Sequence, residues 1–169
     1  MEENNYQQGD WIVHSTYGVG EIQKIEEKKI HGKEVAVFRV KTNDSVYWLP
    51  VANADNSRIR RIADQKALME VLDILISEPQ NMGKDYRMRN VRIKKIFSSS
   101  SLLEKVELLR DLLGVRAEKF WSNTENDAVH MIFEQLASEY SISFDVSLEE
   151  ARKRINAVIL KRFNDYSLI

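Results

Sequence analysis

The sequence predicts a two-domain protein of the β + α class, in which a small five-stranded SH3- or Tudor-like barrel is followed by a compact bundle of about five helices. Three observations predict it. Residues 9–62 form short runs of β-branched and aromatic residues separated by turn signals. After residue 62, apolar residues recur at the three- and four-residue spacing of helices. Ser-x-x-Glu capping signals accompany three of these helical stripes. We therefore expect one domain over 1–62 and a second over 63–169.

The first domain divides into five expected strands, because Gly, Asn and Asp residues that favour tight turns interrupt the β-branched runs. Strands this short bury their edges only by curling into a small barrel. The expected strands span 11–15, 19–25, 35–41, 46–51 and 59–62.

The second domain has the periodicity of amphipathic helices. Its first stripe is Leu68, Val71, Leu72 and Leu75, which recur at i, i+3, i+4 and i+7. Further stripes begin at Leu102, Val129 and Leu148. A basic segment between the first two stripes completes the expected set of five helices.

Start and stop signals support these helices. In a capping box, a serine and a glutamate three residues later each satisfy a backbone donor that the helix leaves unpaired. Pro79 and Gly114 are expected to mark the ends of two helices. The expected boxes are Ser101 with Glu104, Ser122 with Glu125, and Ser147 with Glu150.

The composition excludes several classes of function. The 169 residues include no cysteine, so disulfides, thiolate metal sites and thiol nucleophiles are excluded. His14, His31 and His130 have no second ligand at metal spacing. No constellation for nucleophilic or acid–base catalysis is present. We therefore expect no enzyme activity, no cofactor and no metal.

The location of the protein is predicted by what the sequence lacks. No apolar run approaches the roughly 18 residues that a membrane span needs, and the polar, acidic start is unlike a signal peptide. We therefore expect a cytoplasmic protein without membrane contact. We also expect a monomer. Its 25 basic and 26 acidic residues give a net charge of −1, which argues against a nucleic-acid partner only if the charge is evenly spread.

The charge is not evenly spread. The segment 84–97 holds six basic residues and one acidic residue, a local charge of +5. At about 100° per residue, Tyr86, Ile93 and Phe97 share the side expected to face the bundle. The opposite arc is expected to present cations to a polyanion, and no glutamate at i±4 compensates them. The alternative is a merely solvated helix. The cations of this arc are Lys84, Arg87, Lys94 and Lys95.

Segments of both expected domains resemble a known family. The segments 6–14, 17–20, 49–54 and 59–60 are similar, in this order, to the amino-terminal domain of the CarD/CdnL transcription regulators, a module shared with the transcription-repair coupling factor Mfd. In the helical half, Glu78-Pro79-Gln80-Asn81 and Leu109-Arg110-Asp111-Leu112 resemble the same family. Mfd would continue into a motor, for which this chain has no nucleotide motif.

The resemblance implies a transcription regulator. The family docks its barrel on the β subunit of bacterial RNA polymerase, places its helical domain on promoter DNA at the upstream edge of the melted region, and stabilises the open complex. Lys28, Ile30 and Trp48 match the family's polymerase-contact surface. For Ile30 and Trp48 the alternative is a place in the barrel core. The alternative function is a protein-interaction adaptor that binds polymerase or another partner without touching DNA.

Two positions depart from the family. The helical domain of the family inserts a tryptophan wedge at the fork, and the matching residue here is Met82. Met82 is therefore expected either to wedge between base steps or to be a partly buried filler. Trp121 is a rival wedge, with a role in covering the end of the bundle as its alternative. Tyr17 stands where the family usually has histidine, which does not affect the fold.

Overall fold

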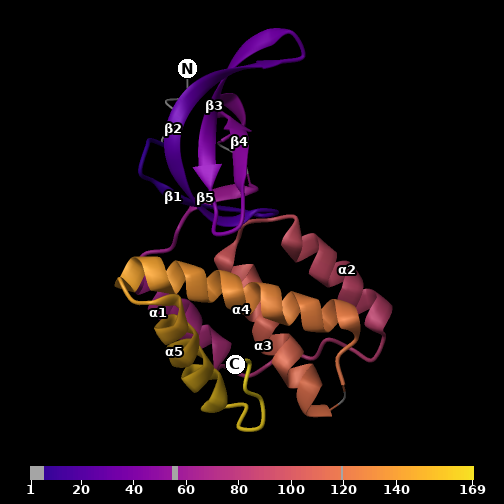
Figure 1. Ribbon diagram of the computed structural model, residues 1–169. Helices are drawn as coiled ribbons and strands as arrows, with labels where there is room; N and C mark the ends of the chain where they lie inside the picture. The colour runs from indigo at the N-terminus through magenta and orange to yellow at the C-terminus, as the bar shows by residue number, and fades with distance from the viewer. Residues whose placement is uncertain (1–5, 55–56, 119) are drawn as a thin grey trace. The chain divides into compact units, whose positions relative to one another are not determined.

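A computed structural model describes residues 6–54, 57–118 and 120–169. The chain divides into two compact units, which are described separately (Figure 1). The first unit comprises Met1–Ile62 and Ser98–Ser100, and the second comprises Ala63–Phe97 and Ser101–Ile169. A five-stranded sheet builds the first unit and five helices build the described part of the second, which confirms the predicted fold class.

The sheet of the first unit is antiparallel and has the strand order β4-β3-β2-β1-β5. Between β4 and β5 the chain forms a short 3-10 helix over Val51–Asn53. The strands are β1 Trp11–His14, β2 Gly18–Ile30, β3 Lys33–Lys41, β4 Val46–Pro50 and β5 Ile59–Arg61.

The β2–β3 hairpin is longer than the sequence predicted, because β2 ends at Ile30 rather than at Ile25. The charged residues that follow Ile25 pair with β3 through to Ile30 opposite Lys33. The connection is the dipeptide His31-Gly32, whose φ angles are 48° and 81°. Positive φ at both central residues matches the right-handed twist of the two strands and favours a tight hairpin. Apolar alternation stops before the pairing does, so the pattern predicted too short a strand.

The core of the first unit comes from alternate residues of the strands. A Cβ at Gly20 would lie 2.8 Å from Cγ1 of Val40, so a glycine is needed where β2 approaches this core valine. The buried residues of the core are Ile12, Ile22, Phe38, Val40, Tyr47, Leu49, Ala54 and Ile59.

The second unit has helices with well-defined starts. The Asp64 side chain accepts a hydrogen bond from the Ala67 amide at 2.8 Å and caps the first helix. Ser122 and Glu125 form the complete predicted capping box, whereas at Ser147 the serine half is present and Glu150 bonds Arg154 instead. The helices are α1 Gln65–Leu75, α2 Tyr86–Phe97, α3 Leu102–Glu118, α4 Asn123–Phe144 and α5 Leu148–Leu160.

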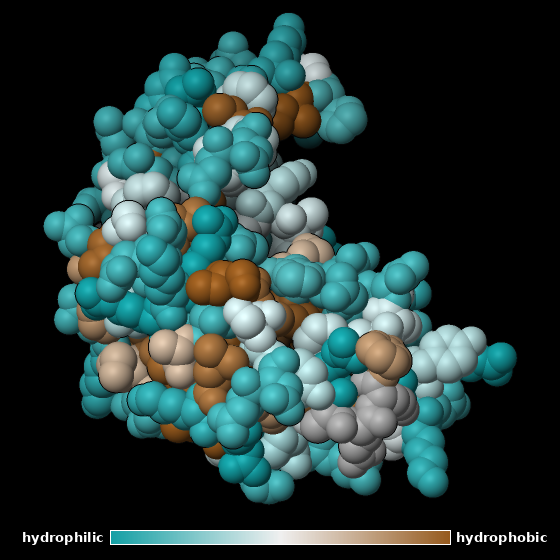
Figure 2. Space-filling view, turned by 60° about the horizontal axis from the view of Figure 1, so that its bottom comes forward, coloured by the Kyte–Doolittle hydropathy of each residue, from teal (hydrophilic) through white to brown (hydrophobic). Residues whose placement is uncertain are grey.

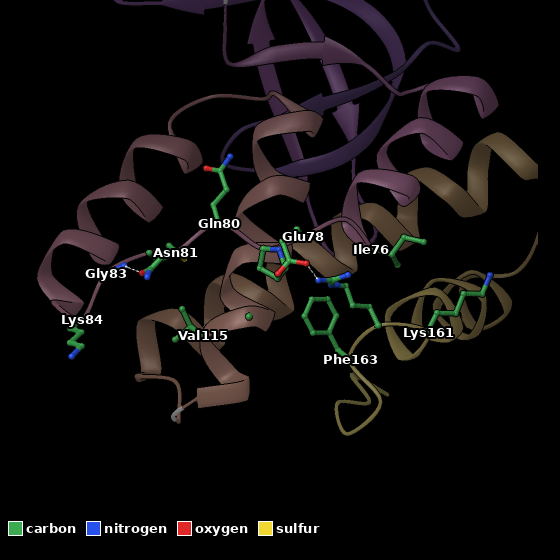
Figure 3. A pocket seen from close by; sticks show the side chains of 13 residues that line it. Ile76, Glu78, Gln80, Asn81, Gly83, Lys84, Val115, Lys161 and Phe163 are labelled. Carbon is green, nitrogen blue, oxygen red and sulfur yellow. Dashed lines mark hydrogen bonds and ion pairs between the residues drawn. The ribbon is translucent and has the colours of Figure 1, made fainter.

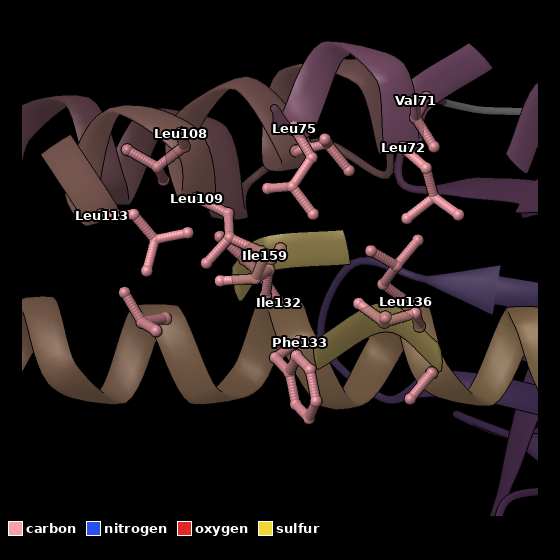
Figure 4. Packing of buried hydrophobic residues seen from close by; sticks show 14 of the residues in the cluster. Val71, Leu72, Leu75, Leu108, Leu109, Leu113, Ile132, Phe133, Leu136 and Ile159 are labelled. Carbon is pink, nitrogen blue, oxygen red and sulfur yellow. The ribbon is translucent and has the colours of Figure 1, made fainter. Parts of the chain in front are cut away.

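Leucine and isoleucine side chains from α1, α3, α4 and α5 interdigitate in one core (Figure 4). Leu68 and Leu75 of the first predicted stripe are fully buried, and Val71 and Leu72 are nearly so. Burial of such side chains contributes about 1.5–3 kcal/mol each, so this core dominates the stability of the unit. No described helix is long and apolar enough to cross a membrane.

Gly114 is not a helix stop, which corrects one prediction. α3 continues past it to Glu118. A Cβ at Gly114 would lie 2.6 Å from Cβ of Pro79, so the glycine allows the segment after α1 to pack directly on α3. Gly114 is therefore explained by close packing against Pro79 and not by the end of a helix.

Candidate functional site

Two of the six cations of the basic segment form ion pairs with carboxylates of other helices. Arg89 is 4% exposed and pairs with Glu125 of α4, which is 1% exposed. The Nη1 group of Arg89 also donates to the Gly83 carbonyl at 3.0 Å. Arg89 therefore holds the start of α2 and the preceding loop on α4, a role that the charge pattern did not predict.

Glu125 is held in its ionised form by these contacts. Desolvation raises the pKa of this carboxyl, but the hydrogen bonds from Arg89 and Ser122 outweigh it, and the net pKa is lowered. One carboxylate thus serves both the Arg89 pair and the capping box of α4.

A second buried carboxylate organises the other side of α2. Asp111 of α3 is fully buried and accepts from Arg92 Nη2 and Arg110 Nε, each at 2.8 Å. It also accepts from the Gln80 amide at 2.9 Å. Because Gln80 precedes α2, Asp111 and Glu125 together fix the loop that leads into the basic helix.

The remaining cations of the segment lie on the surface. Lys84, which lies before the start of α2, and Arg87, Lys94 and Lys95 on α2 are all exposed. The helix α2 therefore has one face that packs on the bundle, which includes Arg89, and another face that is exposed to solvent. Three large side chains share the solvent face with them: Tyr86, Met88 and Val91 are 52%, 65% and 61% exposed.

The prediction that Tyr86 faces the bundle is wrong. Arg89, Ile93 and Ile96 form the buried stripe of α2, and Phe97 packs partly buried beside it. Because Arg89 fills the first buried position of the stripe, Tyr86 at the helix start stays exposed. Its ring lies 5.9 Å from the Arg87 guanidinium, so it belongs to the cationic surface.

Met82 lies in the loop before α2 and is half-buried against the helical core. Asn81 Oδ1 accepts from the Gly83 amide at 2.7 Å, which tightens this loop. Met82 lines a groove of about 730 Å³, whose other walls come from the end of α3 and the residues after α5 (Figure 3). The rival Trp121 donates from Nε1 to the Leu112 carbonyl at 2.7 Å and packs on the core, which favours its covering role.

In the barrel unit, Trp48 lies on the surface and is 43% exposed, so it is not a core residue. The Nζ atom of Lys28 lies 3.2 Å from the centroid of its ring, and its indole Nε1 donates to Glu26 at 2.5 Å. Bonds from Lys24 and Trp48 lower the pKa of Glu26. Ile30 is half-buried at the end of β2. These contacts with a cation and a carboxylate fix the orientation of the Trp48 ring.

The outer part of the β2–β3 hairpin has neighbours on one side only within the described strand pairing. β1 pairs with β2 over Gly18–Glu21, and β4 pairs with β3 over Val37–Lys41. In the described strand pairing, the stretches 27–30 and 33–36 pair only with each other and project from the rest of the sheet (Figure 1). Such edges can accept an added strand.

The space-filling view shows how the surface is composed. Hydrophobic residues on the face shown form small separate groups among hydrophilic ones (Figure 2). Among the residues that the structure describes, no broad apolar patch is visible on that face.

Comparison with known proteins identifies the barrel unit. Residues 6–63 match the family model described as CarD-like/TRCF RID domain. The barrel is a CarD-like domain. The chain is also 26% identical over 140 residues to a Bacillus subtilis (strain 168) protein named "Putative transcription factor YdeB", covering 81% of this chain and 91% of that protein. Both findings support a CarD-like, transcription-related protein, as the resemblance implied.

Proposed function

We propose that this CarD-like protein is a transcription regulator that binds the β subunit of bacterial RNA polymerase through its barrel and promoter DNA near the melting fork through its helical unit, stabilising the open complex. The observation that carries the DNA part is the division of α2 into two faces. Arg89 and Arg92 pair with the buried carboxylates of Glu125 and Asp111, and the side chains of Lys84, Arg87, Lys94 and Lys95 are exposed in a chain of net charge −1.

The exposed cations suit the phosphate backbone. Lysine and arginine contacts to phosphate supply affinity and position without reading sequence, and each contact makes binding weaken with salt. We therefore expect weak, salt-sensitive and largely sequence-independent DNA binding. Promoter selection then comes from recruitment by polymerase, which makes the protein nucleoid-associated in the cytoplasm.

The polymerase part rests on the hairpin surface. An open strand edge supports strand addition by a partner, and an exposed tryptophan beside a cation is the kind of residue that anchors protein interfaces. Trp48 and Lys28 supply this anchor, and Ile30 adds apolar area at the end of β2. Met82, in the loop that Asp111 and Glu125 fix, is proposed as the contact at the edge of the melted region.

The experiment that tests the DNA part reverses charge on α2. The double variant Arg87→Glu/Lys94→Glu should lose binding to duplex DNA at low salt and still co-purify with RNA polymerase. A matched control is Lys66→Glu/Lys153→Glu, because both lysines are exposed and lie on other helices. Equal duplex affinity for the α2 variant and the parent would remove α2 from the DNA interface.

One observation favours a second candidate, an adaptor without DNA contact. The pairing of Arg89 and Arg92 inside the bundle gives α2 a structural reason to be basic. In that case the parent would bind polymerase but no duplex DNA at low salt, and the charge-reversed variant would behave like the parent in promoter opening.

A further inference from the structure

A second cavity of the helical unit lies where α3 ends and α4 begins. Its volume is about 470 Å³, within the range of about 300–1,000 Å³ that small-ligand sites occupy. Met82 and the four exposed cations of the basic segment do not line it, whereas Trp121, the rival wedge, does. The lining residues are Arg116, Phe120, Trp121, Asn123, Asn126, His130, Asp165, Tyr166, Ser167 and Leu168.

Three aromatic rings surround the only arginine of this lining. The Arg116 guanidinium carbon lies 4.4 Å from the ring centroid of Phe120, and 5.7 Å from those of Trp121 and Tyr166. The Tyr166 hydroxyl donates to the Arg116 carbonyl at 3.0 Å, and Trp121 is held by its bond to Leu112. The rings of Trp121 and Tyr166 are therefore held in place by hydrogen bonds within the protein itself.

Phe120 is the third ring, and it is 82% exposed, more than any other large hydrophobic side chain of the described residues. Exposing a phenylalanine in this way forgoes the free energy of burying it, which is of the order of 1.5–3 kcal/mol. A flat partner that stacks on the ring would recover part of this free energy. The Arg116 guanidinium lies over one face of the ring, which leaves the other face for such a partner.

The other wall of the cavity is polar. Asn123, Asn126 and His130 recur at i, i+3 and i+7 on α4 and are all exposed. Amide side chains offer both donors and acceptors, as the edges of nucleobases do. The Asp165 carboxylate in the same lining opposes a free phosphate, so the cavity suits an uncharged base better than an anion.

We propose that this cavity binds an unpaired nucleobase of single-stranded DNA, with Phe120 as the stacking platform and the α4 asparagines on the base edge. The inference rests on the proposed function, which brings the protein to a melting fork where such bases exist. It is also supported by position along the chain: Val115 lines the groove beside Met82 and Lys84, and the next residue, Arg116, lines this cavity.

The test measures fluorescence anisotropy of a labelled single-stranded oligodeoxynucleotide of about 12 nucleotides with the full chain, at low salt. Phe120→Ala should weaken single-strand binding about tenfold, since one base–aromatic stack is worth about that much. Phe120→Trp should restore the affinity. Duplex affinity should be the same in all three proteins. The matched control is Met131→Ala, because Met131 is 55% exposed on α4 and does not line the cavity.

The outcomes separate this inference from the proposed function. Duplex binding by the parent without single-strand binding, or single-strand binding that Phe120→Ala leaves unchanged, overturns the cavity assignment and leaves the proposed function standing. Tighter binding to RNA of the same sequence overturns the choice of DNA. Single-strand binding that depends on Phe120, in a parent that binds no duplex, supports the cavity and overturns the proposed duplex contact. A parent that binds neither overturns both.

Discussion

Arg89 of α2 and Glu125 of α4 form an ion pair in which both side chains are almost fully buried, at 4% and 1% exposed. The glutamate is at the same time the N3 residue of the α4 capping box. A single carboxylate therefore connects the start of the basic helix to the start of α4. Because Arg89 also bonds the Gly83 carbonyl, the position of the loop that carries Met82 depends on the same pair.

The first prediction concerns the stability of this pair. Glu125→Ala should lower the free energy of unfolding by about 3–5 kcal/mol, because it leaves the Arg89 charge buried without a partner. Urea denaturation measures the change. Glu149→Ala is the control: its pair with Lys153 is exposed, and its loss should cost at most about 1 kcal/mol. Equal losses for the two variants would contradict the structural role of the Arg89 pair.

The second prediction concerns pH. The pKa of Glu125 is lowered in the folded protein, so its ionisation adds stability that is present above the ordinary carboxyl pKa of 4.5 and is lost as pH falls through the folded value. The parent should therefore exceed Glu125→Gln in unfolding free energy by the largest amount near neutral pH. The difference should narrow as pH falls below 4.5. A difference that stays constant between about pH 3 and 7 would contradict the assignment.

The third prediction concerns Gly114. Alanine in a helix interior is normally favoured over glycine by about 1 kcal/mol. Here the added methyl would meet Cβ of Pro79 at 2.6 Å, so Gly114→Ala should instead destabilise the protein by about 1–3 kcal/mol. Thermal unfolding measures it. The double variant Gly114→Ala/Pro79→Gly removes the clashing carbon, so a penalty of the same size there would rule out this contact as its cause.

The sequence predicted the elements more completely than the site, for a physical reason. The stripe from Leu68 to Leu75 and the Ser122 box depend on neighbours within one helix, so local spacing reveals them. The Arg89–Glu125 and Arg92–Asp111 pairs each join two different helices, and no local pattern contains that information. The same limit explains the wrong prediction for Tyr86. Periodicity shows which face of a helix is buried, but it does not show at which residue the neighbouring helices stop covering that face.

The fourth prediction concerns Met82. If it contacts the edge of the melted region, Met82→Ala should shorten the lifetime of the open complex more than it weakens duplex binding, because the exposed cations of α2 are unchanged. Promoter-opening kinetics with purified polymerase measure this. Met69→Ala is the control, since Met69 lies on α1, away from the basic helix, and is 50% exposed. Equal open-complex lifetimes for Met82→Ala and the parent would leave Met82 as a partly buried filler only.

The fifth prediction concerns the hairpin surface of the barrel. Trp48 stands between Lys28 and Glu26, so its ring is preorganised for a partner. Trp48→Ala should weaken polymerase binding about thirtyfold, as expected for an interface anchor worth about 2 kcal/mol. Ile25→Ala is the control, because Ile25 is 56% exposed on β2 and, by strand alternation, lies on the face opposite to Glu26. Co-purification and titration with the polymerase β subunit measure both. A larger loss for Ile25→Ala than for Trp48→Ala would place the partner on the other face of the hairpin.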